Sequence, residues 1–78
     1  MKYKSFDEWY EIAHIEYHQQ KYQRYGQFLF NSLARSQPAL ANEICGSDLD
    51  PFHRDDRVTT FLQYVSVNWG KNEVYVVR

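Results

Sequence analysis

The clearest alternation of hydrophobic and polar positions lies near the end of the chain. Five apolar side chains recur there at spacings of three and four residues: Val58, Phe61, Leu62, Val65 and Trp69. This spacing predicts an amphipathic helix, because such residues share one helix face. Asp55 or Asp56 can cap its start, and Gly70 can take the left-handed conformation that ends a helix. We predict a helix over about residues 56–69, with the rest of the chain packed against its apolar face.

A second helical pattern follows Ser5. Ser5 and Glu8 fit a capping box, in which the serine hydroxyl accepts a hydrogen bond from a free amide and the glutamate reaches back. The helix predicted over about residues 6–20 has one aromatic-rich face, formed by Phe6, Trp9, Tyr10, Ala13 and Tyr17. Ile12 and Ile15 fall beside that face. We expect a second element to cover them, the alternative being that they are exposed.

Two shorter helices are predicted in the middle of the chain. The inner face of the first, over residues 25–36, consists of Gly26, Leu29, Phe30 and Leu33. Gly26 lies near its start, where it allows a neighbouring backbone or aromatic ring to approach closely. Pro38 ends this helix and opens another over residues 38–45, which Ser36 or Gln37 can cap and Gly46 can end. Its inward residues are Leu40, Ala41 and Ile44.

These patterns predict one all-α domain over residues 1–78, a small bundle of three to four helices. A chain of 78 residues buries only a small core, and the 18% of aromatic residues can fill it with few side chains. Residues 71–78 follow the last predicted helix. Their run from Val74 to Val77 is β-branched and aromatic, so we predict a short extended C-terminal segment.

The charge argues against general nucleic-acid binding. The formal net charge is -1, whereas proteins that bind nucleic acids present a cationic surface. Residues 38–45 have the place of a recognition helix, but they carry Glu43 and no lysine or arginine. A small nucleic-acid-binding regulator is an alternative that would use the basic residues Lys2, Lys4, Lys21, Arg24 and Arg35.

The single cysteine, Cys45, cannot form an internal disulfide, which suits a reducing cytosol. No histidine or aspartate at a fixed spacing makes Cys45 a catalytic residue, and we interpret it as a small buried side chain. The first residues lack the apolar run of a signal peptide, and no stretch approaches the roughly 18 apolar residues of a membrane span. We expect a cytoplasmic protein that has no membrane partner.

His14 and His18 stand four residues apart, so both imidazoles can reach one metal ion. The zincin motif needs a glutamate directly after the first histidine, but here Glu16 comes two residues later. No third ligand is fixed by spacing. We interpret the pair as two solvated histidines and predict no metal and no cofactor. A metal-binding structural protein using His14 and His18 is a further alternative.

The densest polar cluster follows Ser47 and consists of Asp48, Asp50, His53, Asp55 and Asp56. Oxygen ligands in a loop can bind Ca²⁺ or Mg²⁺, but the glycine and glutamate of an EF-hand do not fall in register after Asp48. Aspartates commonly close Asx-turns and cap helices, and Arg54 and Arg57 offer ion pairs. We therefore interpret this segment as structural, with a partner-binding surface as the alternative.

The middle of the chain carries a series of short motifs. They are Arg24-Tyr25-Gly26-Gln27, Asn31-Ser32-Leu33, Pro38-Ala39-Leu40, Gly46-Ser47-Asp48-Leu49-Asp50-Pro51-Phe52, and Phe61 with Asn68-Trp69. Over about residues 22–69 they resemble a group of short uncharacterised proteins of bacteria, phages and mobile elements. The resemblance implies a compact helical domain with a structural loop at residues 46–52, and it implies no activity and no catalytic residues.

The sequence has no glycine-rich phosphate loop, nucleophile elbow or paired catalytic carboxylates, so we predict that the protein is not an enzyme. Its small size and many aromatic residues favour a non-catalytic module that binds another protein. One form of such a module is an inhibitor of a host system, encoded by a phage or mobile element and of the anti-CRISPR or anti-defence type. The protein can also be a homo-oligomer. The candidate partner-binding residues are Tyr3, Asp7, Glu8, Glu11, Tyr22, Asp48, Asp50, Asp55, Asp56 and Tyr75.

Overall fold

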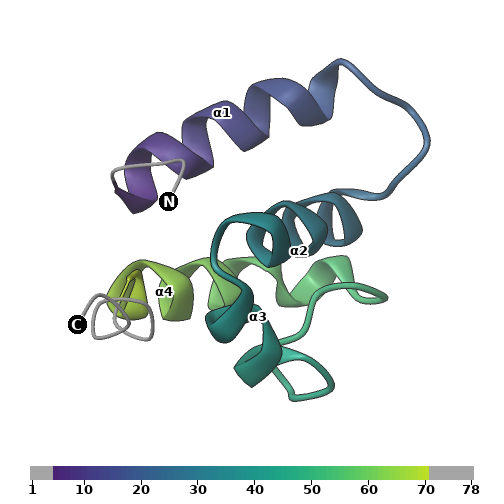
Figure 1. Cartoon of the computed structure of the whole chain (residues 1–78). Helices are drawn as coiled ribbons and strands as arrows, with labels where there is room; N and C mark the ends of the chain where they lie inside the picture. The colour runs from purple at the N-terminus through teal and green to yellow at the C-terminus, as the bar shows by residue number, and fades with distance from the viewer. Residues whose placement is uncertain (1–4, 71–78) are drawn as a thin grey trace.

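A computed structural model of the chain describes residues 5–70. These residues form four α-helices and one 3₁₀ turn: α1 (Phe6–His18), α2 (Tyr25–Ser36), α3 (Pro38–Ile44), η1 (Asp55–Arg57) and α4 (Val58–Asn68). The part of the chain that is described contains no β-strand, which confirms the predicted all-α class. Helix α1 contacts α2 and α4, and α2 packs against α3 (Figure 1).

The predicted helix boundaries agree with the structure to within two residues. Residues 25–36 form α2 as predicted, whereas α1 ends at His18 rather than near residue 20. The expected hydroxyl cap of α1 is present, because Ser5 Oγ accepts a hydrogen bond from Glu8 N–H at 3.2 Å. The final helix begins at Val58 rather than residue 56, because residues 55–57 form the 3₁₀ turn that leads into it.

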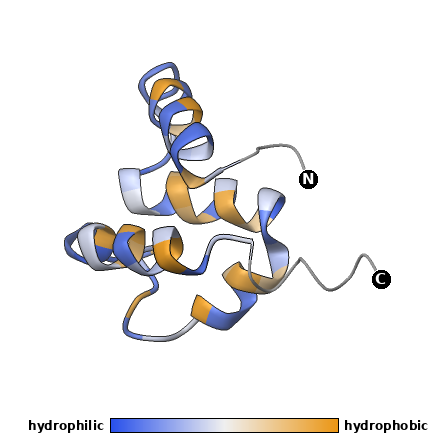
Figure 2. Ribbon diagram, turned by 90° about the vertical axis from the view of Figure 1, so that its left-hand side faces the viewer, coloured by the Kyte–Doolittle hydropathy of each residue, from blue (hydrophilic) through white to orange (hydrophobic). Residues whose placement is uncertain are grey.

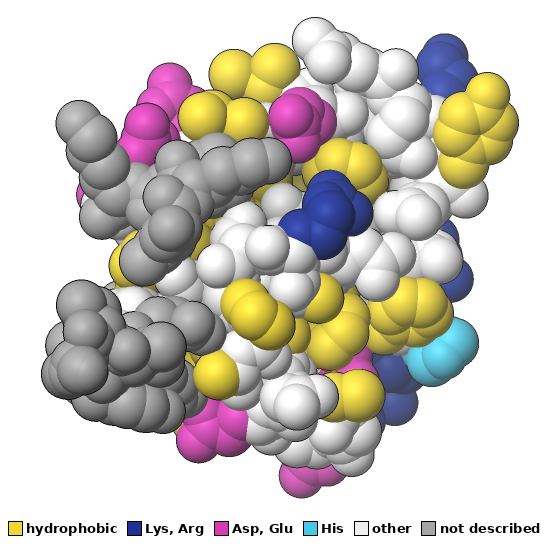
Figure 3. Space-filling model, in the orientation of Figure 1, with side chains coloured by type: hydrophobic (Ala, Val, Ile, Leu, Met, Phe, Trp, Pro, Cys, Tyr) yellow, Lys and Arg dark blue, Asp and Glu magenta, His cyan; other side chains and the backbone are white. Residues whose placement is uncertain are grey.

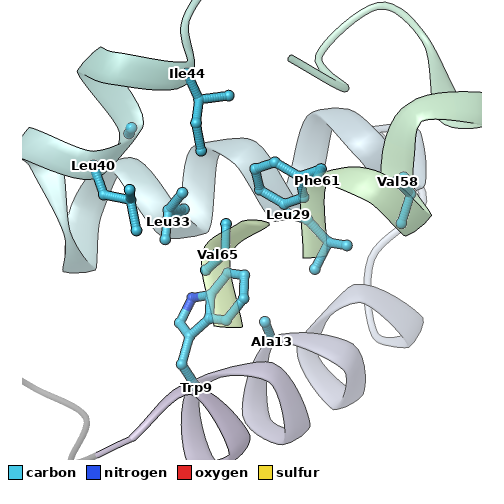
Figure 4. Packing of buried hydrophobic residues seen from close by; sticks show 10 residues of the cluster. Trp9, Ala13, Leu29, Leu33, Leu40, Ile44, Val58, Phe61 and Val65 are labelled. Carbon is cyan, nitrogen blue, oxygen red and sulfur yellow. The ribbon is translucent and has the colours of Figure 1, made fainter. Parts of the chain in front are cut away.

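The core lies where all four helices meet. Hydrophobic and hydrophilic residues alternate around each helix (Figure 2), and the hydrophobic sides converge (Figure 4). Of the predicted stripe on α4, Val58, Phe61 and Val65 are buried, while Leu62 and Trp69 are partly buried. The buried hydrophobic residues are Trp9, Ala13, Leu29, Leu33, Leu40, Ala41, Ile44, Val58, Phe61 and Val65.

Two buried polar contacts connect elements that are distant in sequence. Trp9 Nε1–H, on α1, donates to Ser32 Oγ on α2 at 2.9 Å. The side chain of Gln37 is fully buried, and its Oε1 accepts a hydrogen bond from Gly70 N–H at 3.1 Å. Gln37 is the residue before α3, but it makes no side-chain cap there, contrary to one of the two predicted options. Its amide instead binds the end of α4, where Gly70 has the predicted positive φ of 79°.

The structure corrects two predictions about burial. Ile15 is 52% exposed and Ile12 is half-buried, so no second element covers Ile15. Cys45 is exposed, because it follows the last residue of α3 and lies off the buried face formed by Leu40, Ala41 and Ile44. The predicted extended segment over residues 71–78 lies outside the described residues, as do Tyr3 and Tyr75.

Removal of the Ser32 hydroxyl should destabilise the fold. Ser32→Ala leaves the buried Trp9 N–H without its acceptor, and we expect the free energy of unfolding to fall by about 1–3 kcal/mol. Ser66→Ala is the matched control, because Ser66 is exposed and bonds only the carbonyl of Gln63 in its own helix. Urea unfolding of both variants tests this, and equal stability of the two would contradict it.

Candidate functional site at the junction of α1 and α2

An ordered turn joins α1 to α2 and presents Tyr22 to solvent. Gln20 Oε1 accepts hydrogen bonds from the backbone N–H groups of Tyr22 and Gln23, both at 2.9 Å. Gln20 Nε2 donates to the carbonyl oxygens of Tyr17 and Gln23, at 3.2 and 3.3 Å. One amide side chain thus fixes the turn on both sides. The Tyr22 side chain remains 94% exposed.

A chain of four aromatic polar groups runs along the same junction. Tyr10 Oη lies 2.9 Å from Tyr25 Oη, and Tyr25 Oη lies 3.1 Å from His14 Nδ1. His14 Nε2 in turn lies 3.3 Å from His18 Nε2. Burial, together with the hydrogen bond from Tyr10, raises the pKa of Tyr25 well above its ordinary value. Tyr25 therefore stays a neutral phenol, whose hydroxyl can donate one hydrogen bond and accept another.

The position of these groups follows from the helical repeat. Tyr10, His14 and His18 stand at successive intervals of four residues, so α1 places them in one row. Tyr25 is the first residue of α2, and its ring packs edge-on against His14, with centroids 5.8 Å apart. The sequence indicated the histidine pair but not Tyr25, because nothing local in the sequence shows which helix end faces α1.

The loop of residues 46–52 is held by its own side chains, as the structural interpretation predicts. Asp50 Oδ2 accepts from Gly46 N–H at 2.8 Å, and Asp50 Oδ1 accepts from Phe52 N–H at 2.9 Å. Ser47 Oγ donates to Ile44 O at 2.6 Å and accepts from Leu49 N–H at 3.1 Å. Asp50 is therefore a loop-closing residue.

A close contact joins Pro51, in this loop, and Asp55, in η1, to the start of α2. The N-cap residue of α2, Arg24, makes no side-chain cap. Instead Asp55 Oδ1 accepts a hydrogen bond from Gly26 N–H at 2.9 Å, across 29 residues of sequence. A Cβ atom on Gly26 would lie 2.2 Å from Pro51 O, so the predicted close approach at Gly26 is made by backbone.

This contact corrects the predicted cap of α4. Neither Asp55 nor Asp56 caps that helix; its N-cap is Arg57, which makes no side-chain cap bond. Asp56 pairs with Arg54 through two hydrogen bonds of 3.0 and 2.8 Å. The hydrogen bond from Arg54 holds the pKa of Asp56 below its usual value.

The other predicted site residues do not form one described surface. Asp7, Glu8 and Glu11 are exposed on α1, and Asp48 is exposed in the loop. Acidic side chains lie around the edge of the face shown in Figure 3 and do not gather at its centre. Of the basic residues proposed for nucleic acid, Lys21 and Arg35 are exposed. Arg24 donates to Phe52 O and lies 3.8 Å from Asp55 Oδ1, whereas Lys2 and Lys4 lie outside the described residues.

A shallow apolar depression between α2 and α3 was not predicted. Its volume is about 240 Å³, and its lining consists of Phe30, Ala34, Pro38, Ala41, Asn42 and Cys45. Hydrophobic side chains gather near the middle of the face in Figure 3. Ala34 and Ala41 contribute small side chains to its lining, one from each helix.

Residues 5–70 also bear on metal binding and on membrane insertion. Within that range no three or more histidine, cysteine, aspartate or glutamate side chains gather closely enough to enclose a metal ion. No helix of the described segment has the length and apolar character needed to cross a membrane.

Comparison of the chain with protein-family models, curated proteins and solved structures found no match.

Replacement of Asp55 tests the contact between the loop and α2. Asp55→Ala leaves Gly26 N–H without its acceptor, and we expect a loss of about 0.5–2 kcal/mol in unfolding free energy. Asp55→Asn should retain most of the stability, because an asparagine oxygen can accept the same hydrogen bond. Asp56→Ala is the neighbouring control, since it removes only an exposed ion pair. A larger effect of Asp56→Ala than of Asp55→Ala in chemical denaturation would refute this role.

Proposed function

We propose that the protein is a small, non-catalytic module that binds another protein, with Tyr22 as its central contact. The supporting observation is that this large aromatic side chain is 94% exposed on a turn that four hydrogen bonds of Gln20 hold in place. An exposed tyrosine on a disordered loop would lose much conformational entropy on binding. On an ordered turn, folding has already restricted the backbone, so the backbone loses less conformational entropy on binding.

The chemistry of tyrosine suits this role. Its ring offers a large apolar area and its hydroxyl a hydrogen bond, and tyrosine is enriched among the residues that contribute most to protein–protein affinity. Lys21 is exposed beside Tyr22 in sequence, so the contact has an apolar centre and a charged neighbour. We expect the partner surface to be a pocket that receives one aromatic ring.

The proposal has an extension for the case that a phage or mobile element carries the gene. The protein would then inhibit a host system, as anti-CRISPR and other anti-defence proteins do. This extension rests on the resemblance of residues 22–69 to short proteins of those sources and on the size of the chain. With this extension we also propose that the protein is cytoplasmic, because such host systems act there. Expression of the chain in cells with and without an active defence system, followed by phage challenge, tests the extension separately from binding.

The test of binding compares two exposed apolar residues. Tyr22→Ala should lower the affinity for the partner by about thirtyfold or more, because central aromatic contacts contribute about 2 kcal/mol or more. The stability of the fold should be unchanged, because the Tyr22 side chain packs against little. Val67→Ala, which removes another exposed apolar side chain (65% exposed), should bind normally.

The measurement is affinity capture from lysate of the source organism with wild-type, Tyr22→Ala and Val67→Ala proteins in parallel. A partner that the wild type and Val67→Ala retain and Tyr22→Ala loses supports the proposal. Equal recovery by all three proteins, or recovery by none, argues against it.

A contribution from the acidic edge of α1 is tested by charge removal. If Asp7, Glu8 and Glu11 imitate nucleic acid toward a basic groove, alanine at all three positions should weaken binding, and more so at low salt. Circular dichroism should confirm that α1 still forms, because Asp7 and Glu8 also suit its positive end. Affinity that stays the same at both ionic strengths would exclude the acidic edge from the interface.

A further inference from the structure

His14 and His18 already have the spacing of two ligands on one metal ion. They lie one turn apart on α1, both are exposed, and their Nε2 atoms are 3.3 Å apart. Two nitrogen ligands at about 2.0–2.1 Å from a tetrahedral zinc ion lie about 3.3–3.4 Å from each other. The separation of the two Nε2 atoms therefore matches that of two ligands on one zinc ion.

A second observation concerns the other nitrogen of His14. Tyr25 Oη lies 3.1 Å from His14 Nδ1, and Tyr10 Oη lies 2.9 Å from Tyr25 Oη. Histidines that bind metals almost always donate their remaining ring N–H to an oxygen, which fixes the tautomer and the ring orientation. Tyr25 is placed to accept from Nδ1–H, and this tautomer leaves the lone pair of His14 Nε2 free.

We propose that His14 and His18 form a binding site for a divalent transition-metal ion, zinc above all, through their Nε2 atoms. Imidazole is a ligand that zinc, copper and nickel all accept, and the separation of the two nitrogens fits the tetrahedral preference of zinc. Tyr25 is a positioning residue for His14, and water fills the remaining coordination positions.

Metal binding replaces the contact between the two rings. With His14 in the Nδ1–H tautomer, the contact between the two rings in the metal-free pair has His18 Nε2–H as donor and His14 Nε2 as acceptor. Zinc needs both lone pairs, so His18 loses the hydrogen from its Nε2 to solvent and gains one at Nδ1. Starting from two neutral rings, no net proton is released. The Nδ1–H of His14 still donates to Tyr25 Oη, which can in turn donate to Tyr10 Oη.

Calorimetric titration with zinc chloride tests the site. The full chain is used without a tag, after treatment with chelator, at about one pH unit above the ordinary histidine pKa of about 6.5. We expect one zinc ion per chain for the wild type and for His53→Ala. His53 is the matched control, because it is the remaining histidine of the chain and is also exposed. His14→Ala and His18→Ala should each lose about tenfold or more in affinity.

Absence of zinc binding by the wild type, or equal affinity of the His14→Ala and wild-type proteins, would overturn the proposal. Neither histidine is in the core, so both alanine variants should fold, which circular dichroism verifies.

The role of Tyr25 is tested by a matched pair of hydroxyl removals. Tyr25→Phe removes the group that contacts His14, and we expect about a tenfold loss of zinc affinity, as for other residues that orient a metal-binding histidine. Tyr10→Phe removes a hydroxyl one step further from the metal and should have a smaller effect.

Nitrogen chemical shifts of the imidazoles give an independent measurement. Zinc-bound His14 and His18 of the wild type should both be in the Nδ1–H tautomer, and Tyr25→Phe should lower the share of that tautomer in metal-free His14. Unchanged affinity and unchanged tautomer in Tyr25→Phe would exclude the positioning role.

Discussion

The contact between the start of α2 and the loop that precedes α4 is the constraint on which the arrangement of these elements depends. Gly26 has no side chain, so the carbonyl of Pro51 and the carboxylate of Asp55 can approach the backbone of α2 directly. Pro51 is itself fully buried. The same contact supplies a cap that α2 lacks locally and fixes the point from which α4 starts. A side chain at position 26 would have to push the loop away, and α4 with it.

Helix α1 is held to this framework in a different way. Its contacts are mainly aromatic: Trp9 lies within the core, and Phe6 and Tyr10 pack around it. Aromatic side chains with polar tips place apolar area inside and polar atoms at the rim. The row of tyrosine and histidine groups between α1 and α2 is therefore a consequence of how α1 packs. It presents phenol and imidazole groups at the surface without a cleft.

The sequence predicted the helices well because the information that defines them is local. The periodicity of α4, the capping serine of α1 and the proline that opens α3 each act within one or two turns, and the structure confirms all three helices. The sequence also indicated that Gly26 allows a neighbouring backbone or ring to approach closely. The identity of its neighbour was not visible, because Pro51 is 25 positions away and only folding brings it close.

The errors have a common physical origin. The aspartates before α4 match the composition of a helix cap, but Asp55 caps the start of α2, because the three-dimensional fold places that helix end within reach. Ile15 and Cys45 are apolar residues that the small bundle leaves uncovered. For the candidate site, the helical repeat predicted the histidine row on α1. The repeat could not predict the contact of Tyr25 with His14 or the hydrogen bonds of Gln20 in the turn. Both depend on how α2 packs against α1.

The two tryptophans give this small protein a built-in optical probe. Trp9 is fully buried and Trp69 is partly buried, and their ring centroids are 5.5 Å apart although 60 positions separate them in sequence. At that distance the transitions of the two indoles can couple and so contribute to the near-ultraviolet circular dichroism. Because one ring belongs to α1 and the other follows α4, the signal reports the docking of α1 on the remaining helices. Separation of α1 can thus be followed spectroscopically even while each helix keeps its own secondary structure.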